Sequence, residues 1–515
     1  MKERQRWPSR TDPAPLPPLP PCRRAAVGVL GALALVAGCR TSAPAPSFDL
    51  VITDGRVIDP ETKLDSVQNV GVDSGVVRAI SGGSLAGRDT IDASGLVVAP
   101  GFIDLHAHGQ TLENYRVQAL DGVTTALELE LGTSDVDAWY AERQGAPPIN
   151  YGVAVGHPRV RVEVMGDSGV TFPSGPGAHR VGTEAEVRAI LAGIEKGLAQ
   201  GAIGVGLGLQ YTPAASEREV LEIFRLAARH GAPAFVHIRH MGATPPGAVV
   251  GLKEAIGSAA VMGASLHVFH VHSSGLRVAP ELLRMIGEAR RAGGDVTTEV
   301  YPYSAGSTAI ESALFDPGWQ KIFGIDYGDL EWPPTGERLT AESFVRYRRQ
   351  GGWIVIHVIP EAIVDSAIVS PLTIIASDGR LEGGRGHPRT AGTYARVLGR
   401  YVRERGLLTL MDALGKMTLM PARRLEGRVV EMKRKGRIQV GSDADLVIFD
   451  PATVIDRATY QEPALPSAGI AHVVVGGVSV VKDGRLVEGT AAGRPIRASV
   501  KGRDPAPAGT PATPR

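Results

Sequence analysis

Cysteine is nearly absent from this sequence. The 515 residues contain two, Cys22 and Cys39, and both lie near the amino terminus. No disulfide framework is therefore available to the rest of the chain. Any metal site downstream must be built from His, Asp and Glu, without thiolate ligands.

An excess of either charge is also absent. Lys and Arg total 55 against 54 Asp and Glu, which gives a formal net charge of +1. The chain has no basic stripe with interleaved aromatic residues, so we expect no nucleic-acid partner. Hydrophobic residues make up 43% and charged residues 21%, as in ordinary globular proteins, and the length exceeds that of one ordinary domain.

The apolar run from Ala25 to Ala37 is too short to span a bilayer as a helix. It follows Arg23-Arg24 and ends in Val36-Ala37-Gly38-Cys39, an arrangement typical of a signal peptide. Small residues just before a cysteine resemble a bacterial lipobox, which implies cleavage before Cys39 and attachment of lipid to its sulfur. A plain secretory signal with a chance cysteine is the alternative.

The leader interpretation predicts the location of the protein. We expect a leader with a lipoprotein signal peptide over residues 1–38 and a flexible tether over residues 39–47. The mature protein is then exported and anchored in the bacterial cell envelope, facing the periplasm. Its membrane contact is expected only through the lipidated Cys39.

The pattern after the tether predicts an α/β chain with two folded parts. Residues 98–429 alternate short apolar strands with helical patterns, which predicts a TIM-like (β/α)8 barrel. The strands are expected near 98–106, 123–131, 150–156, 202–208, 233–238, 265–271, 295–301 and 372–377. The helices include 184–200, 216–230, 279–292 and 393–405.

Both ends of the chain flank this barrel with strand-like segments. Alternating residues at 48–97 and again at 430–495 predict a small β-sandwich domain composed of both ends. The stretch from Asp316 to about Gln350 has irregular patterning and is a candidate lid over the barrel mouth. The tail, residues 496–515, is rich in Pro, Ala and Thr and is expected to be disordered.

Polar side chains stand at the carboxyl ends of several predicted strands, where chemistry occurs in such barrels. His106 and His108 end the first strand and would share a face, as would Glu128 and Glu130 on the second. Three more candidates end the fifth, sixth and eighth strands: His237, His270 and Asp378. Four histidines with one or two Glu and an Asp suit a divalent metal, best zinc.

The segment from Pro100 to His108, Pro-Gly-Phe-Ile-Asp-Leu-His-Ala-His, resembles a motif of the amidohydrolase superfamily. Within that superfamily the chain resembles the N-acyl-D-amino-acid deacylase (D-aminoacylase) family from about residue 48 to 495. The segments that carry this resemblance are 208–213 (Gly-Leu-Gln-Tyr-Thr-Pro), 301–308 (Tyr-Pro-Tyr-Ser-Ala-Gly-Ser-Thr), 377–379 (Ser-Asp-Gly), 387–399 and 436–446.

The resemblance implies that residues 98–429 form the catalytic barrel of a metal-dependent hydrolase, and it implies roles for the strand-end residues. His106 and His108 would hold one metal position, His237 and His270 the other, and Asp378 would be the catalytic carboxylate. The family often has a bridging cysteine after the second strand; here Glu130, or Glu128 one pleat earlier, is the available replacement. One or two zinc ions are expected per chain.

Two further departures bear on these roles. The fourth strand ends in Gly204-Val-Gly-Leu-Gly208 without a lysine, so the carboxylated-lysine arrangement of other superfamily members is not expected. Gly109-Gln110 follow the histidine pair, where the family often has an acidic residue. Substrate selection near the first strand is therefore the place where this chain is expected to differ from its relatives.

The substrate carboxylate of an N-acyl amino acid needs a cation. Arg239 lies two residues from His237 and is expected to share its face, and Arg389 lies in the loop after the eighth strand; either could instead form a salt bridge at the rim. Tyr211 and Ser307 belong to the family motifs and could hydrogen-bond the substrate. His272 could be a ligand, an oxyanion donor or a structural residue.

Together these features predict a zinc hydrolase of a linear amide C–N bond in a small N-acyl-D-amino acid or dipeptide-like substrate. Zinc-activated water would attack the amide carbonyl, and Asp378 would move the proton to the leaving amine. A hydantoinase-like or isoaspartyl-dipeptidase-like amidohydrolase is the nearest alternative. A lipid-anchored, non-catalytic binding protein is the alternative of a different class.

Overall fold

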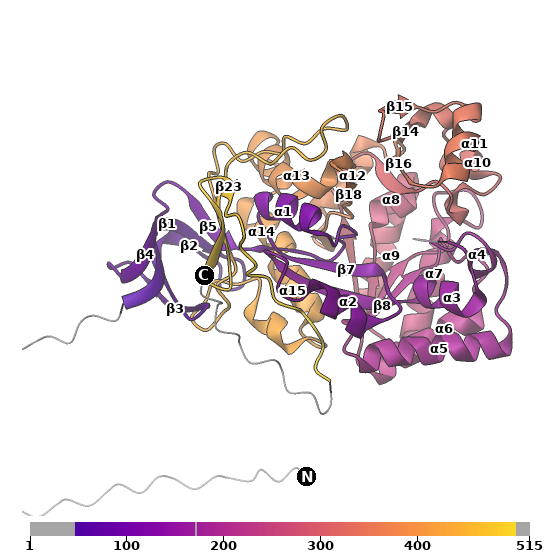
Figure 1. Cartoon of the computed structure of the whole chain (residues 1–515), viewed down its shortest axis with the longest axis horizontal. Helices are drawn as coiled ribbons and strands as arrows, with labels where there is room; N and C mark the ends of the chain where they lie inside the picture. Colours follow the sequence, from indigo (N-terminus) through magenta and orange to yellow (C-terminus); the bar gives the residue numbers. More distant parts are fainter. Residues whose placement is uncertain (1–46, 170–171, 501–515) are drawn as a thin grey trace, which may run out of the picture. The chain divides into compact units, whose positions relative to one another are not determined.

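The computed structural model describes residues 47–169 and 172–500 (Figure 1). The expected leader, Cys39 and nearly all of the expected tether lie outside these residues. Among the described residues, no helix combines the length and the apolar character needed to cross a membrane.

Eight parallel strands form the predicted barrel sheet, in the order β17-β12-β11-β10-β9-β8-β7-β6. Their bounds are β6 (Phe102–Asp104), β7 (Val123–Thr133), β8 (Asn150–Gly156), β9 (Val205–Gly208), β10 (Ala234–His237), β11 (Leu266–Val268), β12 (Val296–Val300) and β17 (Thr373–Ile375). The prediction of eight strands is confirmed. Because β6 and β17 are the ends of this order, the contacts between them decide whether the sheet closes.

Asp104 joins the two edge strands. Its buried carboxylate accepts the backbone N–H of Ser377 at 3.0 Å and that of His106 at 3.1 Å. One step further along, Ala107 pairs with Gly379 in an isolated parallel bridge. The segments that carry His106 and Asp378 are therefore held side by side.

Helices follow the barrel strands as the alternating pattern predicted. The expected helices at 184–200, 216–230 and 279–292 are confirmed as α5 (Glu184–Ala199), α6 (Glu217–Arg229) and α9 (Ala279–Arg291). The helix expected at 393–405 begins earlier, as α13 (Arg389–Arg396), and continues as the π-helical segment η4 (Val397–Glu404). The other helices are α1 (Leu112–Leu120), α2 (Val136–Arg143), α3 (His157–Met165), α4 (Pro176–His179), α7 (Gly247–Met262), α8 (Val271–Gly275), α12 (Glu361–Val369), α14 (Leu410–Met417) and α15 (Leu419–Leu425).

The first predicted barrel strand, 98–106, is divided between two sheets. β5 (Val97–Pro100) pairs with β1 (Ser47–Asp59) and β20 (Leu446–Phe449) outside the barrel, and only β6 belongs to the barrel. The division falls at Gly101, where a Cβ atom would lie 2.2 Å from the Thr124 side chain. His106 and His108 consequently follow the strand instead of lying within it.

The small β-domain is formed by both ends of the chain, as predicted. Its nine strands make one sheet in the order β23-β22-β21-β20-β5-β1-β2-β3, with β4 also paired to β1. Figure 1 shows the indigo strands of the first segment beside the yellow strands of the last. The remaining bounds are β2 (Leu64–Asp73), β3 (Val76–Ser81), β4 (Ala86–Asp92), β21 (Ile470–Val475), β22 (Val478–Lys482) and β23 (Arg485–Leu486).

The stretch after β12 is more regular than its sequence pattern indicated. β13 (Gly306–Ala309), β16 (Trp353–Ile356), β14 (Leu330–Trp332) and β15 (Glu337–Arg338) form a four-stranded antiparallel sheet, with α10 (Trp319–Phe323) and α11 (Ala341–Gln350) beside it. Stacked aromatic pairs organise it: Trp332 lies 4.2 Å from Tyr347, and Trp319 lies 5.5 Å from Phe344, between ring centroids. The expectation of an irregular segment was wrong because these pairs join residues far apart in the sequence.

The predicted start of the disordered tail, at residue 496, lies too early in the sequence. Ile496 is 1% exposed, its N–H donates to the carbonyl of Tyr151 at 2.7 Å, and its carbonyl accepts the hydroxyl of Tyr140 at 2.6 Å. Ala498 donates to the carbonyl of Gly201 at 3.0 Å. Residues 496–500 thus contact the barrel, whereas 501–515 lie outside the described residues.

Ile496→Ala should therefore lower the unfolding free energy by about 2–5 kcal/mol, because it removes buried methyl groups and leaves a cavity. Urea denaturation measures the change. Val487→Ala, at a position that is 38% exposed, is the matched control and should cost less than about 0.5 kcal/mol. Equal small effects of both variants would show that the last segment does not pack on the barrel.

Candidate functional site

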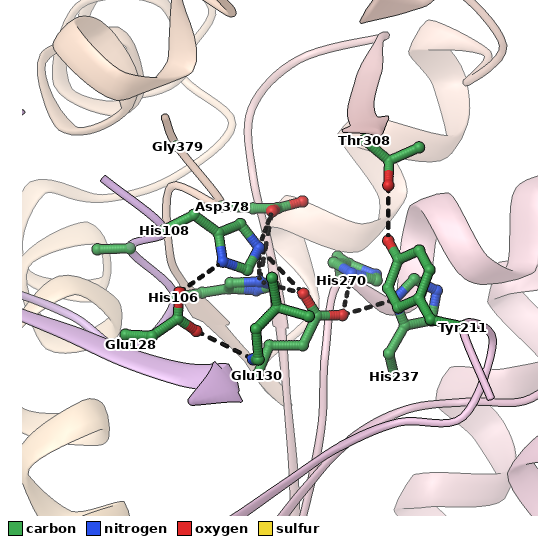
Figure 2. A network of polar contacts seen from close by, with 12 residues as sticks. His106, His108, Glu128, Glu130, Tyr211, His237, His270, Thr308, Asp378 and Gly379 are labelled. Atoms are coloured by element: carbon green, nitrogen blue, oxygen red, sulfur yellow. Dashed lines mark hydrogen bonds and ion pairs between the residues drawn. The ribbon is translucent and has the colours of Figure 1, made fainter. Parts of the chain in front are cut away.

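Four histidines and two carboxylates meet at the carboxyl ends of the barrel strands. The side chains of His106, His108, Glu130 and Asp378 form one group of closely spaced donor atoms, and Glu130, His237 and His270 form a second. All of them are buried. Figure 2 shows Glu130 between the two histidine pairs, so this one carboxylate joins both groups.

The first group is compact. His106 Nε2 lies 3.1 Å from His108 Nε2, 3.1 Å from Glu130 Oε2 and 3.3 Å from Asp378 Oδ1. His108 Nε2 lies 3.0 Å from Glu130 Oε2 and 3.2 Å from Asp378 Oδ1. Ligands held tetrahedrally at zinc distances of about 2.0–2.1 Å are about 3.3 Å apart. The spacing of these four atoms fits one zinc ion.

The second group uses the other oxygen of Glu130. Glu130 Oε1 lies 2.6 Å from His237 Nδ1 and 3.8 Å from His270 Nε2. His237 Nε2 is buried and has no hydrogen-bond partner among the described residues. Three protein donors, as these residues offer, are the number of protein ligands in a catalytic zinc site.

A bulge in β7 lets Glu130 reach both groups. Glu128 pairs with Val153 of β8, but the next pair is Thr133 with Val155, so four residues of β7 stand against one of β8. Glycine makes room for the bulge, since a Cβ atom on Gly206 would lie 2.2 Å from the Glu130 carbonyl oxygen. In a regular strand, Glu128 and Glu130 would point to the same face with similar surroundings. The bulge gives them different surroundings.

Glu128 and Glu130 accordingly have different neighbours. Glu128 Oε2 lies 2.8 Å from His108 Nδ1. This is the ring nitrogen that does not face Glu130 and Asp378. Its other oxygen accepts the N–H of Leu131 at 3.0 Å. The structure thus places Glu128 behind His108 and Glu130 at the centre, where the sequence left the two open.

A second carboxylate, which the sequence analysis missed, lies behind His106. Glu299 Oε1 is 2.6 Å from His106 Nδ1, and Glu299 Oε2 is 3.0 Å from His267 Nε2. His267 Nδ1 in turn lies 2.8 Å from Thr297 Oγ1. The alternation Thr297-x-Glu299 in a buried strand was the available signal, because an acidic side chain there needs a partner.

The electrostatics of the site favour cations. Burial opposes the protonation of His106, yet Asp378 and Glu299 raise its pKa to about 10. Burial likewise opposes the ionisation of Glu130, but His237, His106 and His108 hold its pKa well below the usual range. Four carboxylates face these imidazoles, and two divalent cations would balance their charge without protonating the rings.

Asp378 is fixed from two sides. Its Oδ1 faces the first histidine pair, and its Oδ2 lies 2.9 Å from Arg389 Nη1. Burial opposes its ionisation, but Arg389 and His106 outweigh that effect and lower the pKa of Asp378. The guanidinium of Arg389 lies over the Tyr301 ring at 4.5 Å, and its Nε has no partner among the described residues.

A small cavity opens beside the second group. It measures ≈ 40 Å³ and is lined by His237, His270 and Asp378 together with Tyr211, Tyr301 and Ser307. The Tyr211 hydroxyl lies 3.0 Å from Thr308 Oγ1, and its ring meets His237 edge-on at 5.1 Å. Tyr211, Ser307 and Arg389 are thus brought to the site as the sequence analysis expected.

Arg239 does not line this cavity, so the structure does not bring it to the site in the way that the sequence pattern predicted. Its guanidinium is paired with Glu254 through two N–H groups, at 2.9 and 2.6 Å, and caps the carbonyls of Pro213 and Ala215. The expectation assumed that side chains keep alternating beyond His237. β10 ends at His237, and the backbone turns there.

His272 lies outside both groups of donor atoms. Its ring meets Tyr301 edge-on at 4.2 Å. Neither ring nitrogen has a hydrogen-bond partner within the described part of the chain, and burial together with His270 and Arg389 holds its pKa well below the usual range. A neutral ring next to the cavity can still donate one hydrogen bond.

Comparison with known proteins agrees with this geometry. The model of the Amidohydrolase family matches residues 89–481, and the chain belongs to that family. It is 32% identical to a D-aminoacylase of Alcaligenes xylosoxydans xylosoxydans over 87% of this chain and 97% of the relative. It is 33% identical to an N-acyl-D-glutamate deacylase of the same organism over 84% and 93%.

Solved structures show the same relationship. An N-acyl-D-glutamate deacylase from Bordetella bronchiseptica, complexed with zinc and a phosphonate mimic of the tetrahedral intermediate, is 29% identical with a TM-score of 0.75. A D-aminoacylase described by its binuclear metal centre is 28% identical with a TM-score of 0.75. Each comparison covers 88% of this chain and 100% of the other. A D-hydantoinase at 17% identity and a TM-score of 0.60 shares the fold.

A buried ion cluster joins α3, α4 and α6 near Tyr211. Glu219 of α6 lies 2.8 Å from His157 Nε2 and accepts two bonds from Arg161, at 2.5 and 2.6 Å. Arg161 also binds the carbonyl of Gly177 at 2.6 Å. Phe172, which precedes α4, packs on Tyr211 with 4.1 Å between the ring centroids. The cluster therefore positions one wall of the site.

Glu219→Gln should lower the unfolding free energy at pH 7 by about 3–5 kcal/mol, since it leaves a buried guanidinium without its counter-charge. Burial raises the pKa of Glu219, but His157 and Arg161 lower it overall from 4.5 to about 2. The stabilisation is therefore complete above pH 4.5 and is lost as the pH falls toward 2.

Denaturation curves at pH 7 and pH 3 measure this effect. The difference between the wild type and Glu219→Gln should shrink at pH 3. Glu222→Gln on the same helix is the control, because Glu222 pairs with Arg225 at the surface and should contribute less than about 1 kcal/mol. A deficit of Glu219→Gln that is independent of pH would refute the ionised cluster.

Proposed function

We propose that this protein is a zinc-dependent amidohydrolase that removes the acyl group from N-acyl-D-amino acids. The observation that carries the proposal is the shared carboxylate: Glu130 presents one oxygen to His106 and His108 and the other to His237 and His270. The relatives that act on N-acyl-D-amino acids match nearly the whole described chain, which supports the substrate class.

In this proposal the two donor groups hold the metal. His106, His108, Glu130 and Asp378 form one position, and Glu130, His237 and His270 form the other. Glu128 and Glu299 accept hydrogen bonds from the Nδ1 atoms of His108 and His106, which leaves each Nε2 free to bind metal. Bound zinc would supply Lewis acidity and lower the pKa of a water molecule to about 7.

The protein's own side chains then handle the proton and the substrate. Asp378 accepts the proton of the attacking water and returns it to the leaving amine. Arg389 holds Asp378 ionised and offers its unpartnered Nε to the substrate carboxylate. Tyr211 and Ser307 line the cavity and supply hydroxyl donors for the acyl carbonyl and the carboxylate.

Two alternatives account for less of the site. A hydantoinase-like centre built on a carboxylated lysine has no lysine available, because β9 ends in Gly208. A non-catalytic binding protein would have no physical need to bury four carboxylates against four imidazoles, since each buried charge costs free energy unless it is compensated.

Purified protein loaded with zinc should hydrolyse N-acetyl-D-amino acids and leave their L-enantiomers nearly untouched. Asp378→Asn should lower kcat by about 10²- to 10⁴-fold, because the proton relay is lost while the cavity keeps its shape. Asp483→Asn, at an exposed position, should keep full activity. A preference for L-substrates would contradict the proposed substrate class, and full activity of Asp378→Asn would contradict the mechanism.

Metal content separates the roles of the two neighbouring glutamates. Glu130→Gln should lose zinc from both positions, since it alters both groups. Glu128→Gln should retain both ions with affinity weakened by about 10- to 100-fold, because it disturbs only the orientation of His108. Elemental analysis after dialysis against graded chelator measures both, and equal losses would refute the central position of Glu130.

We further propose that the protein is exported and anchored through a lipid on Cys39, facing the periplasm. The support is the order of Arg23-Arg24, an apolar run and Val36-Ala37-Gly38-Cys39. In cells fed radiolabelled palmitate, the wild-type protein should carry label in the membrane fraction. Cys39→Ser should be unlabelled, and label on that variant would exclude this attachment site.

A further inference from the structure

A second cavity of the described residues lies at the opposite end of the barrel from the metal-binding groups. It measures ≈ 430 Å³, within the range of small-molecule sites. Its wall is formed where barrel strands begin, at Pro233 before β10, Ser265 before β11 and Thr297 at the start of β12, and by α15. No residue of the proposed active site lines it.

Arginine dominates this cavity, which we call the basal cavity. Four line it against a single carboxylate: Arg290, Arg423, Arg424 and Arg428, with Asp295. Arg423 also pairs with Glu61 outside the lining, at 3.0 Å. Two guanidinium charges are left without a carboxylate even after both acidic partners are counted.

Arg428 is one of the uncompensated cations. Its N–H groups donate only to backbone carbonyls, those of Leu198, Ala202 and His230, at 2.9–3.3 Å. Burial lowers the pKa of Arg428, so keeping its guanidinium charged costs free energy. An anion in the cavity would offset that cost.

Arg424 and Arg290 point to the same conclusion. The side chain of Arg424 is 6% exposed and uses two nitrogens on Asp295, at 2.8 and 2.6 Å, while its Nε has no hydrogen-bond partner in the described chain. The guanidinium of Arg290, at the carboxyl end of α9, is exposed and makes no side-chain hydrogen bond or ion pair with residues 47–169 or 172–500. A buried donor without an acceptor, such as Arg424 Nε, is uncommon in folded proteins.

We propose that the basal cavity is a binding site for a small organic phosphate. Planar guanidinium groups match phosphate oxygens in pairs, and four arginines line this cavity. A cavity of this size accommodates a phosphorylated small molecule rather than a bare ion. The site is separate from the deacylase chemistry and does not depend on it.

Calorimetric titration of the zinc-loaded full-length protein with ribose 5-phosphate tests the proposal, with inorganic phosphate as the smaller probe. We expect saturable binding at one site and tighter binding of the sugar phosphate. Arg290→Gln and Arg423→Gln, both at exposed positions where folding is not at risk, should each weaken binding by about tenfold or more. Arg428 is left intact because it caps three backbone carbonyls.

Arg284→Gln is the matched control. Arg284 lies on α9 like Arg290 and is exposed, but it does not line the cavity. It forms an ion pair with Glu288, with 2.6 Å between the nitrogen and the oxygen. Arg284→Gln should therefore bind the phosphate like the wild type. Binding that survives unchanged in Arg290→Gln/Arg423→Gln would show that the phosphate binds outside the basal cavity and would overturn the proposal. Absence of saturable binding, or equal weakening by Arg284→Gln, would overturn it as well.

Discussion

The active centre depends on one carboxylate that must serve two sites at once. Glu130 can face two imidazole pairs only because its strand bulges out of register with β8 and because Gly206 leaves space for its backbone. A regular strand would place Glu128 and Glu130 equivalently on one face, two residues apart, and neither would lie midway between the histidine pairs. The bulge therefore converts two similar side chains into a central ligand candidate and a support for His108.

Much of the remaining site is built to hold this carboxylate and its imidazoles in one arrangement. Asp104 fastens the edge strands of the barrel and with them the loops of His106 and Asp378. Glu299 and Glu128 fix two rings from behind, and Arg389 fixes Asp378. Such supports restrict each ring to one orientation, which is the condition for a metal site to be selective as well as tight.

The sequence predicted those parts of the site that depend on local order. His237, His270 and Asp378 end short apolar strands, and eight such strands specify a barrel, so their convergence followed from the pattern. Residues whose position depends on a change of backbone direction could not be placed from the strand pattern. Arg239 follows the last residue of β10 and turns away, and Glu130 lies in a bulge that no periodicity reveals. Glu299 was missed because its partners, His106 and His267, are supplied by two other segments of the chain.

Two residues of the centre, His270 and Asp378, have positive φ angles of 25° and 53°. Non-glycine residues reach this region only at a conformational cost. Glycine would relieve it but would remove the imidazole or the carboxylate. No single substitution at these positions can therefore relieve the backbone strain and also keep the imidazole or the carboxylate. Substitutions that raise the stability of this protein must therefore lie outside these two positions. We expect thermostable variants to retain the conformational free-energy cost of His270 and Asp378.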